Sequence, residues 1–114
     1  MADCIFCKIA EKKIPAKMAY EDADVVAFHD IQPQAPVHIQ IIPRRHVARV
    51  SELTGETAGL MGTLVMTANR LARELSIAEE GYRLVVNCNA GAGQSVYHLH
   101  LHLLGGRPMR WPPG

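Results

Sequence analysis

The sequence has none of the compositional excesses that mark several protein classes. Aromatic residues make up 5% of its 114 residues, and acidic and basic residues nearly cancel to a formal net charge of +1. A protein that binds nucleic acid or a membrane surface without specificity normally carries a basic patch, and this balance argues against one. The longest apolar stretches are far too short to span a bilayer. We therefore predict no nucleic-acid partner and no membrane association.

Cysteine is also scarce. The three cysteines are an odd number, which argues against a disulfide framework. Cys4 and Cys7 have the C-x-x-C spacing, which in a reducing compartment indicates half a zinc site or a redox pair. Cys88 fits neither and is predicted to be an inert or loop thiol. Residues 1–4 lack the basic, apolar and small-residue order of a secretory signal, so we expect a cytoplasmic protein.

The chain lacks repeats, low-complexity segments and long linkers, and its 48% of hydrophobic residues suffices for one core. We predict a single domain over residues 1–114. Apolar residues at three- and four-residue steps predict a long helix at 56–75 with Thr54 as its N-cap, and residues 4–10 are expected to form a short helix or turn. Strands are expected at 25–29, 37–42 and 82–87. Short connections between them favour an antiparallel sheet with the long helix packed on it, an α+β fold.

Three histidines, His98, His100 and His102, occupy alternate positions near the C-terminus. In an extended strand alternate side chains share a face, so these imidazoles would line one face while the intervening leucines cover the other. Imidazole changes charge near neutral pH and offers a nitrogen nucleophile or a metal ligand. Ordinary, hydrogen-bonded histidines of a core strand are the alternative. His29, beside Asp30 at a strand end, is predicted to be structural or solvated.

A glycine-rich segment, residues 88–95, leads directly into the histidines. Glycines let backbone N–H groups turn inward around an anion, and Gln94 and Ser95 add donors. By itself the segment could equally be a plain hairpin connection. Beside three imidazoles it indicates chemistry at phosphorus.

Phosphoryl or nucleotidyl transfer needs a nucleophile, donors for the phosphate oxygens and help for the leaving group. His100, the central imidazole, is the predicted nucleophile, with its Nδ1–H donating to a backbone carbonyl and neutral Nε2 facing phosphorus. His102 would hydrogen-bond a phosphate oxygen, and Ser95 would donate to the departing amine or oxygen. His38, on the polar face of the strand at 37–42, either supports this site or is a satisfied core histidine.

The run from Gly93 to Leu104, G-Q-S-V-Y-H-L-H-L-H-L-L, resembles the signature of the histidine-triad (HIT) superfamily. Further similar segments are I-P-A at 14–16, A-F-H-D-I at 27–31, P-Q-A-P at 33–36 and I-P at 42–43. The tail from Leu104, which ends in W-P-P-G, resembles the histidine-triad nucleotide-binding (Hint) branch. The resemblance covers nearly the whole chain.

The resemblance implies a fold: a five-stranded antiparallel sheet with one long and one or two short helices, dimerising across a two-fold axis. It also implies a purine nucleoside phosphoramidase that cleaves the P–N bond of adenosine 5′-phosphoramidates, such as AMP–amine and AMP–lysine, releasing AMP and the amine. His100 would form a nucleotidyl-histidine intermediate, Asp30 would bind the ribose hydroxyls and Ile31 would lie against the base. Trp111 on the tail would approach the partner's active site and affect substrate choice, or simply pack in the dimer. The residues around the α-phosphate would be Asn87, Gly93, Gln94, Ser95 and His102.

The Cys4–Cys7 pair departs from those Hint members that lack it and resembles other, largely microbial, HIT proteins with zinc near the N-terminus. By position, His46 and His98 would complete that site. Such a Cys₂His₂ set is a closed, tetrahedral arrangement, so the zinc would be structural; free thiols are the alternative, and no organic cofactor is expected. His98 could reach the cysteines only from the edge of the sheet, because zinc–nitrogen bonds are about 2.0–2.1 Å long.

Two other functions remain open at this point. The chain could be a dinucleoside polyphosphate hydrolase, as in the fragile-histidine-triad branch, although the W-P-P-G tail and short length favour the phosphoramidase. It could also be a zinc-stabilised nucleotide-binding module without catalysis.

Overall fold

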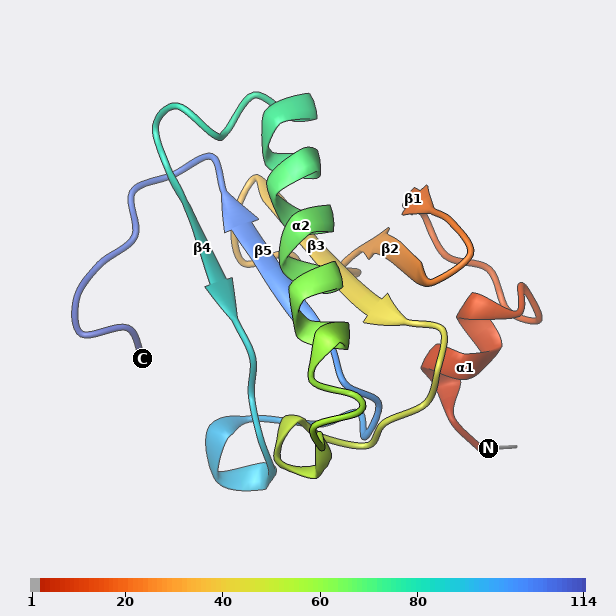
Figure 1. Ribbon diagram of the computed structural model, residues 1–114. Coiled ribbons are helices and arrows are strands. Elements are labelled where there is room, and N and C mark those ends of the chain that lie inside the picture. The colour runs from red at the N-terminus through yellow and green to blue at the C-terminus, as the bar shows by residue number, and fades with distance from the viewer. Residues whose placement is uncertain (1–2) are drawn as a thin grey trace.

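A computed structural model describes residues 3–114, so the first two residues of the segment tested for a secretory signal lie outside the described range. Its five strands form one antiparallel sheet in the order β1-β2-β3-β5-β4 (Figure 1). The strands are β1 (Met18–Glu21), β2 (Val25–His29), β3 (Val37–Pro43), β4 (Tyr82–Val85) and β5 (Leu101–Gly105). With helices α1 (Ile5–Ala10) and α2 (Gly59–Glu74), this confirms the predicted α+β fold.

Helix α2 lies across one face of the sheet (Figure 1). Its predicted apolar stripe is buried there: Leu64, Ala68 and Leu71 are at most 2% exposed and pack in one cluster with sheet residues such as Ile39 and Leu101. Burying side chains of this size is the main favourable contribution to folding. The stripe therefore fixes which face of the sheet the helix covers.

The predicted start of α2 is wrong. The helix begins at Gly59, with Ala58 as an N-cap that makes no side-chain hydrogen bond. The Thr57 hydroxyl accepts the N–H of Thr54 at 2.8 Å, and the Thr54 carbonyl accepts the N–H of Ala58 at 2.8 Å. These bonds close a separate turn before the helix, so Thr54 does not cap it.

Helix α1 covers part of the opposite face. Its N-cap is Cys4, whose Sγ accepts the N–H of Cys7 at 3.3 Å. Phe6 packs against Phe28 of β2 with ring centroids 5.2 Å apart, in a second core cluster that includes Ile42. The short helix is thereby fixed next to the sheet face that carries the histidines.

Strand β5 is shorter than the histidine pattern suggests. Its pairing with β3 runs from Gly105 to Leu101, and the N–H of Leu99 bonds instead to the carbonyl of Val47 at 2.6 Å. His98 and His100 therefore precede the strand. Strand β4 is also shorter than predicted and ends at Val85.

In the part of the chain that the structure describes, no helix is both long and apolar enough to cross a membrane.

Candidate active site and metal cluster

The three histidines lie on the sheet face opposite α2. Leu99, Leu101 and Leu103 are at most 2% exposed and belong to the core under α2. The His100 and His102 rings are adjacent, with centroids 5.0 Å apart. The alternation predicted from the sequence is thus present, although only His102 lies within β5.

Backbone geometry fixes the proton on His100. Its Nδ1 lies 2.7 Å from the carbonyl oxygen of His98, and a carbonyl can only accept, so Nδ1 carries the proton. The ring is 7% exposed, and burial lowers its pKa, an effect that the bond to His98 opposes. The neutral ring therefore keeps an unprotonated Nε2, the state that a nucleophile needs.

A second chain of hydrogen bonds fixes the proton on His102. The N–H of Gln34 donates to His38 Nδ1 at 3.0 Å, so the proton of neutral His38 is on Nε2. That Nε2 lies 2.9 Å from His102 Nδ1, which must accept. Burial lowers the pKa of His38 and lowers that of His102 to about 4. Neutral His102 therefore carries its proton on Nε2, which can donate a hydrogen bond. His38 contacts His102 and so lies on the sheet face that carries the histidines.

Asp30 lies beside these rings at the end of β2. Its Oδ1 accepts the N–H of Gln32 at 2.8 Å, and its Oδ2 accepts Nε2 of Gln40 at 2.7 Å. The same Oδ2 is 3.5 Å from His38 Nε2. Gln40 was not identified from the sequence; its position on the polar face of β3, two residues after His38, was the available signal.

An apolar cavity of about 450 Å³ opens beside Asp30. Ile5, Phe6 and Ile9 of α1 line it together with Phe28 and Ile31, and Ile31 is 95% exposed. The cavity has room and apolar walls for a planar base.

The glycine-rich segment turns sharply before the histidines. Asn89 and Gly93 have positive φ values of 70° and 95°, on either side of a 3₁₀ turn at Ala90–Ala92. Ser95 is exposed, and Asn87 is half-buried just beyond β4. Four of the five predicted phosphate residues, Asn87, Gly93, Gln94 and Ser95, thus lie in the loop between β4 and β5, and His102 lies on β5.

Gln94 has a different role from the one expected for its side chain. Nε2 donates to the carbonyls of Ala48 at 2.9 Å and Val96 at 3.1 Å, and Oε1 accepts the N–H of Asn89 at 2.8 Å. The amide has no N–H left for a phosphate, because it has only two. Gln94 instead holds the loop in shape.

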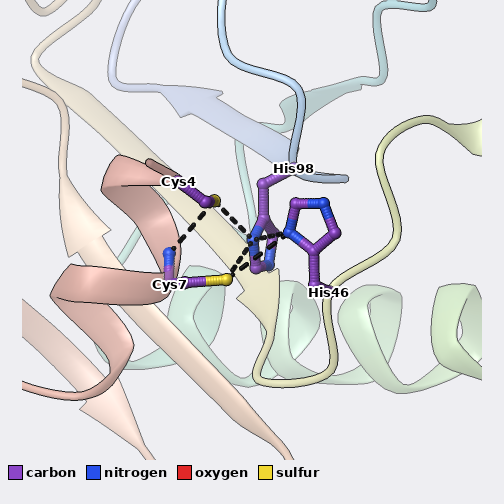
Figure 2. A group of neighbouring side chains, drawn as sticks. All are labelled: Cys4, Cys7, His46 and His98. Carbon is purple, nitrogen blue, oxygen red and sulfur yellow. Dashed lines mark hydrogen bonds between the residues drawn. The ribbon is translucent and has the colours of Figure 1, made fainter. Parts of the chain in front are cut away.

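Figure 2 shows Cys4, at the N-terminus of α1, and Cys7, on α1, pointing toward His46 and His98. His98 Nδ1 is 3.3 Å from Cys4 Sγ, 3.5 Å from Cys7 Sγ and 3.2 Å from His46 Nδ1. All four candidate ligand atoms lie within 4.8 Å of one another. His98 precedes β5, an inner strand of the sheet, and contacts the cysteines from that position.

The donor set fits a tetrahedral zinc ion. Zinc bonds of about 2.0–2.3 Å place ligand atoms about 3.3–3.8 Å apart, close to the distances found here. His98 Nε2 donates to the Pro43 carbonyl at 2.8 Å, which leaves Nδ1 unprotonated toward the cluster. Burial and the neighbouring Cys4 thiol raise the pKa of Cys7 to about 11, which disfavours its thiolate form. A bound cation would stabilise the thiolate and so reverse this effect.

Three residues that the sequence analysis discussed, Cys88, His29 and Trp111, lie outside these two clusters. Cys88 Sγ is 3.4 Å from the Ser51 hydroxyl and contacts no other cysteine within the described residues. His29 is half-buried at the end of β2, where burial lowers its pKa. Trp111 is 83% exposed on the tail.

Fold and site together define an α+β protein with a row of histidines on the sheet face opposite its long helix, beside a glycine-rich loop. Residues 11–109 match the family model described as the HIT domain. The chain belongs to the HIT family.

Similar proteins agree with this assignment. An uncharacterized HIT-like protein of Synechococcus elongatus is 49% identical over 112 residues, which cover 98% of this chain and 97% of that protein. A HIT family hydrolase of Legionella pneumophila has a TM-score of 0.96 at 50% identity, covering 98% of this chain and 100% of that one. A histidine triad nucleotide-binding protein of Candida albicans has a TM-score of 0.80 at 30% identity, covering 98% and 85%.

Proposed function

We propose that this protein is a nucleotide hydrolase, specifically a purine nucleoside phosphoramidase that releases AMP and an amine from adenosine 5′-phosphoramidates. The observation that carries the proposal is the His100 ring, whose Nδ1–H is bound by the His98 carbonyl so that Nε2 is a free base. The similar hydrolase and nucleotide-binding proteins support the broader class.

The substrate would extend along the face that carries the histidines. The purine base fits the apolar cavity beside Ile31, and the ribose hydroxyls would reach the carboxylate of Asp30. The phosphate would then meet the loop around Gly93 and the Nε2–H of His102. In this order the reacting phosphorus would lie next to His100.

The reaction would proceed in two displacements. His100 Nε2 attacks phosphorus, the P–N bond breaks, and the departing nitrogen takes a proton, directly or through water, from the Ser95 hydroxyl. Water then attacks the nucleotidyl-histidine, the N–P bond breaks, and one water proton returns to Ser95. His102 Nε2–H stabilises the negative charge on the phosphate oxygens in both steps. The balance is one phosphoramidate and one water giving AMP and an amine.

Turnover of an AMP–lysine phosphoramidate tests this function. We expect wild type to release AMP and His100→Ala to lose at least about 10³-fold in kcat, because no other group can form the covalent intermediate. Melting temperature and AMP affinity check that the variant is folded. Equal inactivity of wild type and variant would contradict the proposal, and turnover of diadenosine polyphosphates alone would favour the alternative hydrolase.

We further propose that Cys4, Cys7, His46 and His98 bind a structural zinc ion. The fit of the four ligand atoms and the unprotonated Nδ1 of His98 support this. Zinc would link α1 to the loop that bears His46 and to the segment that leads into the histidine row. The thiolates require a reducing compartment, in keeping with the cytoplasmic location expected from the sequence.

Finally, we propose a homodimer formed along β4. Strand β4 is an edge of the sheet with regular pairing, whereas the other edge, β1, is interrupted by an irregular register between Met18 and Tyr20. A regular edge strand can pair with a second copy, and an irregular one is protected from doing so. The tail also runs beyond β4 (Figure 1), which would carry Trp111 toward the partner.

A further inference from the structure

Gln40 lies at the middle of the proposed substrate path. On β3 it pairs in register with Phe28 of β2 on one side and with His102 of β5 on the other. Phe28 lines the apolar cavity, and His102 belongs to the phosphate end. The residue between them therefore lies where the sugar of a nucleotide would be.

Of the two polar atoms in the Gln40 side-chain amide, one has a hydrogen-bond partner and the other has none. Its Nε2 donates to Asp30 Oδ2 at 2.7 Å, which fixes the orientation of the amide, because a carboxylate can only accept. Its Oε1 is buried and has no hydrogen-bond partner among the described residues. A buried acceptor without a donor is unfavourable. Because Gln40 lines the apolar cavity, a ligand bound there can supply the missing donor.

We propose that Gln40 determines the sugar specificity of this site: its Oε1 accepts a hydrogen bond from a ribose hydroxyl while its Nε2 holds Asp30 in place for the same sugar. The inference rests on the proposed nucleotide site and adds a residue to it. Phosphate offers no donor at neutral pH, and the base would lie on the Phe28 side. The sugar hydroxyls are the donors that the middle position can meet.

The chemistry predicts selection of ribonucleotides over deoxyribonucleotides. A site built to bond a hydroxyl rejects an analogue that lacks it, because its own buried polar group is then left unpaired. In a site without the amide, that penalty disappears and the two sugars bind more alike.

The test is calorimetric binding of AMP, 2′-deoxy-AMP and 3′-deoxy-AMP to wild type, Gln40→Leu and Gln40→Lys. Lysine keeps a donor for Asp30 but has no acceptor, so it separates the two roles of the amide. We expect wild type to prefer AMP over at least one deoxy analogue by about tenfold. Both variants should reduce that ratio to about twofold, whatever their overall affinity.

The outcomes separate this inference from the function on which it rests. Wild type that binds none of the three nucleotides contradicts the nucleotide site itself. Wild type that binds all three equally, or variants that keep the full preference for AMP, overturns the role of Gln40 alone. Reduced preference in Gln40→Leu with full preference in Gln40→Lys also overturns it, because Asp30 would then be the sole determinant.

Discussion

Proton positions on the histidines are set by groups that do not titrate near neutral pH. A backbone carbonyl orders His100, and a backbone amide orders His38 and through it His102. Asp30 lies 3.5 Å from His38 Nε2 and adds negative charge near that pair. Each ring therefore keeps one defined tautomer in the folded protein, and burial keeps it neutral.

This arrangement makes stability depend on pH. Burial and, to a smaller extent, the neighbouring His100 and His38 lower the pKa of His102 to about 4, against the opposing effect of Asp30. The unfolded chain binds more protons between the ordinary value of about 6.5 and pH 4, so this contribution is complete above pH 6.5 and is lost as pH falls through 4.

Urea unfolding of metal-free protein at pH 7.5 and 4.5 measures this contribution. We expect His102→Asn to reduce the loss of unfolding free energy between the two pH values by about 1–2 kcal/mol. An equal loss of unfolding free energy in wild type and variant would show that folding does not lower the pKa of His102.

At the scale of elements, α1 joins two sites. Its N-cap Cys4 and its residue Cys7 belong to the candidate metal site, and its side chains Phe6 and Ile9 line the apolar cavity. A helix of six residues has little stability by itself. Anything that fixes its N-terminus should therefore also shape the cavity.

We expect removal of the metal to weaken nucleotide binding. Protein purified without chelators should hold about one zinc ion per chain, and Cys4→Ser should lose the ion, melt at a lower temperature and bind AMP about fivefold more weakly. Metal analysis, thermal melting and calorimetry measure these three effects. Cys88→Ser is the matched control and should retain all three properties. Metal-free protein with unchanged AMP affinity would contradict the coupling.

At the scale of the whole molecule, the β4 edge leaves the sheet open to continue into a second copy. Val65 of α2 is half-buried one turn before Asn69, whose side chain accepts a hydrogen bond from Tyr82 of β4 at 2.7 Å. The neighbouring Met66 is 67% exposed and lines a groove with Tyr20 of β1, at the other edge. A two-fold interface along β4 would bury the surface around Val65 and leave the surface around Met66 exposed.

Sedimentation measures this directly. We expect wild type to have twice the 12.5 kDa mass of one chain. Val65→Glu should shift the equilibrium to single chains, and Met66→Glu, the control on the next position of the same helix, should remain dimeric. A wild type that sediments as one chain would exclude the dimer, and dissociation by Met66→Glu alone would place the interface at the other edge.

Much of the fold was predictable because it depends on local periodicity. The α2 stripe at three- and four-residue steps and the leucines between His98, His100 and His102 assigned both buried faces correctly. The start of α2 was not predictable, because Thr54 matches a cap but bonds to Thr57 in a turn. The start of β5 was also not predictable, because the N–H of Leu99 bonds to the Val47 carbonyl, which no local pattern pairs with it.

The candidate site likewise has some features that the sequence predicts and others that it does not. The order of residues alone determined that three imidazoles share one face, because alternation is a property of any extended strand. Only the tertiary structure decided which nitrogen of each imidazole holds a proton. It also brought together Cys4 and His98, which are 94 residues apart in the sequence, and left the Gln40 side-chain oxygen without a donor. The physical reason is that hydrogen bonds and ligand geometry depend on distances between segments, and the chain order does not specify those distances.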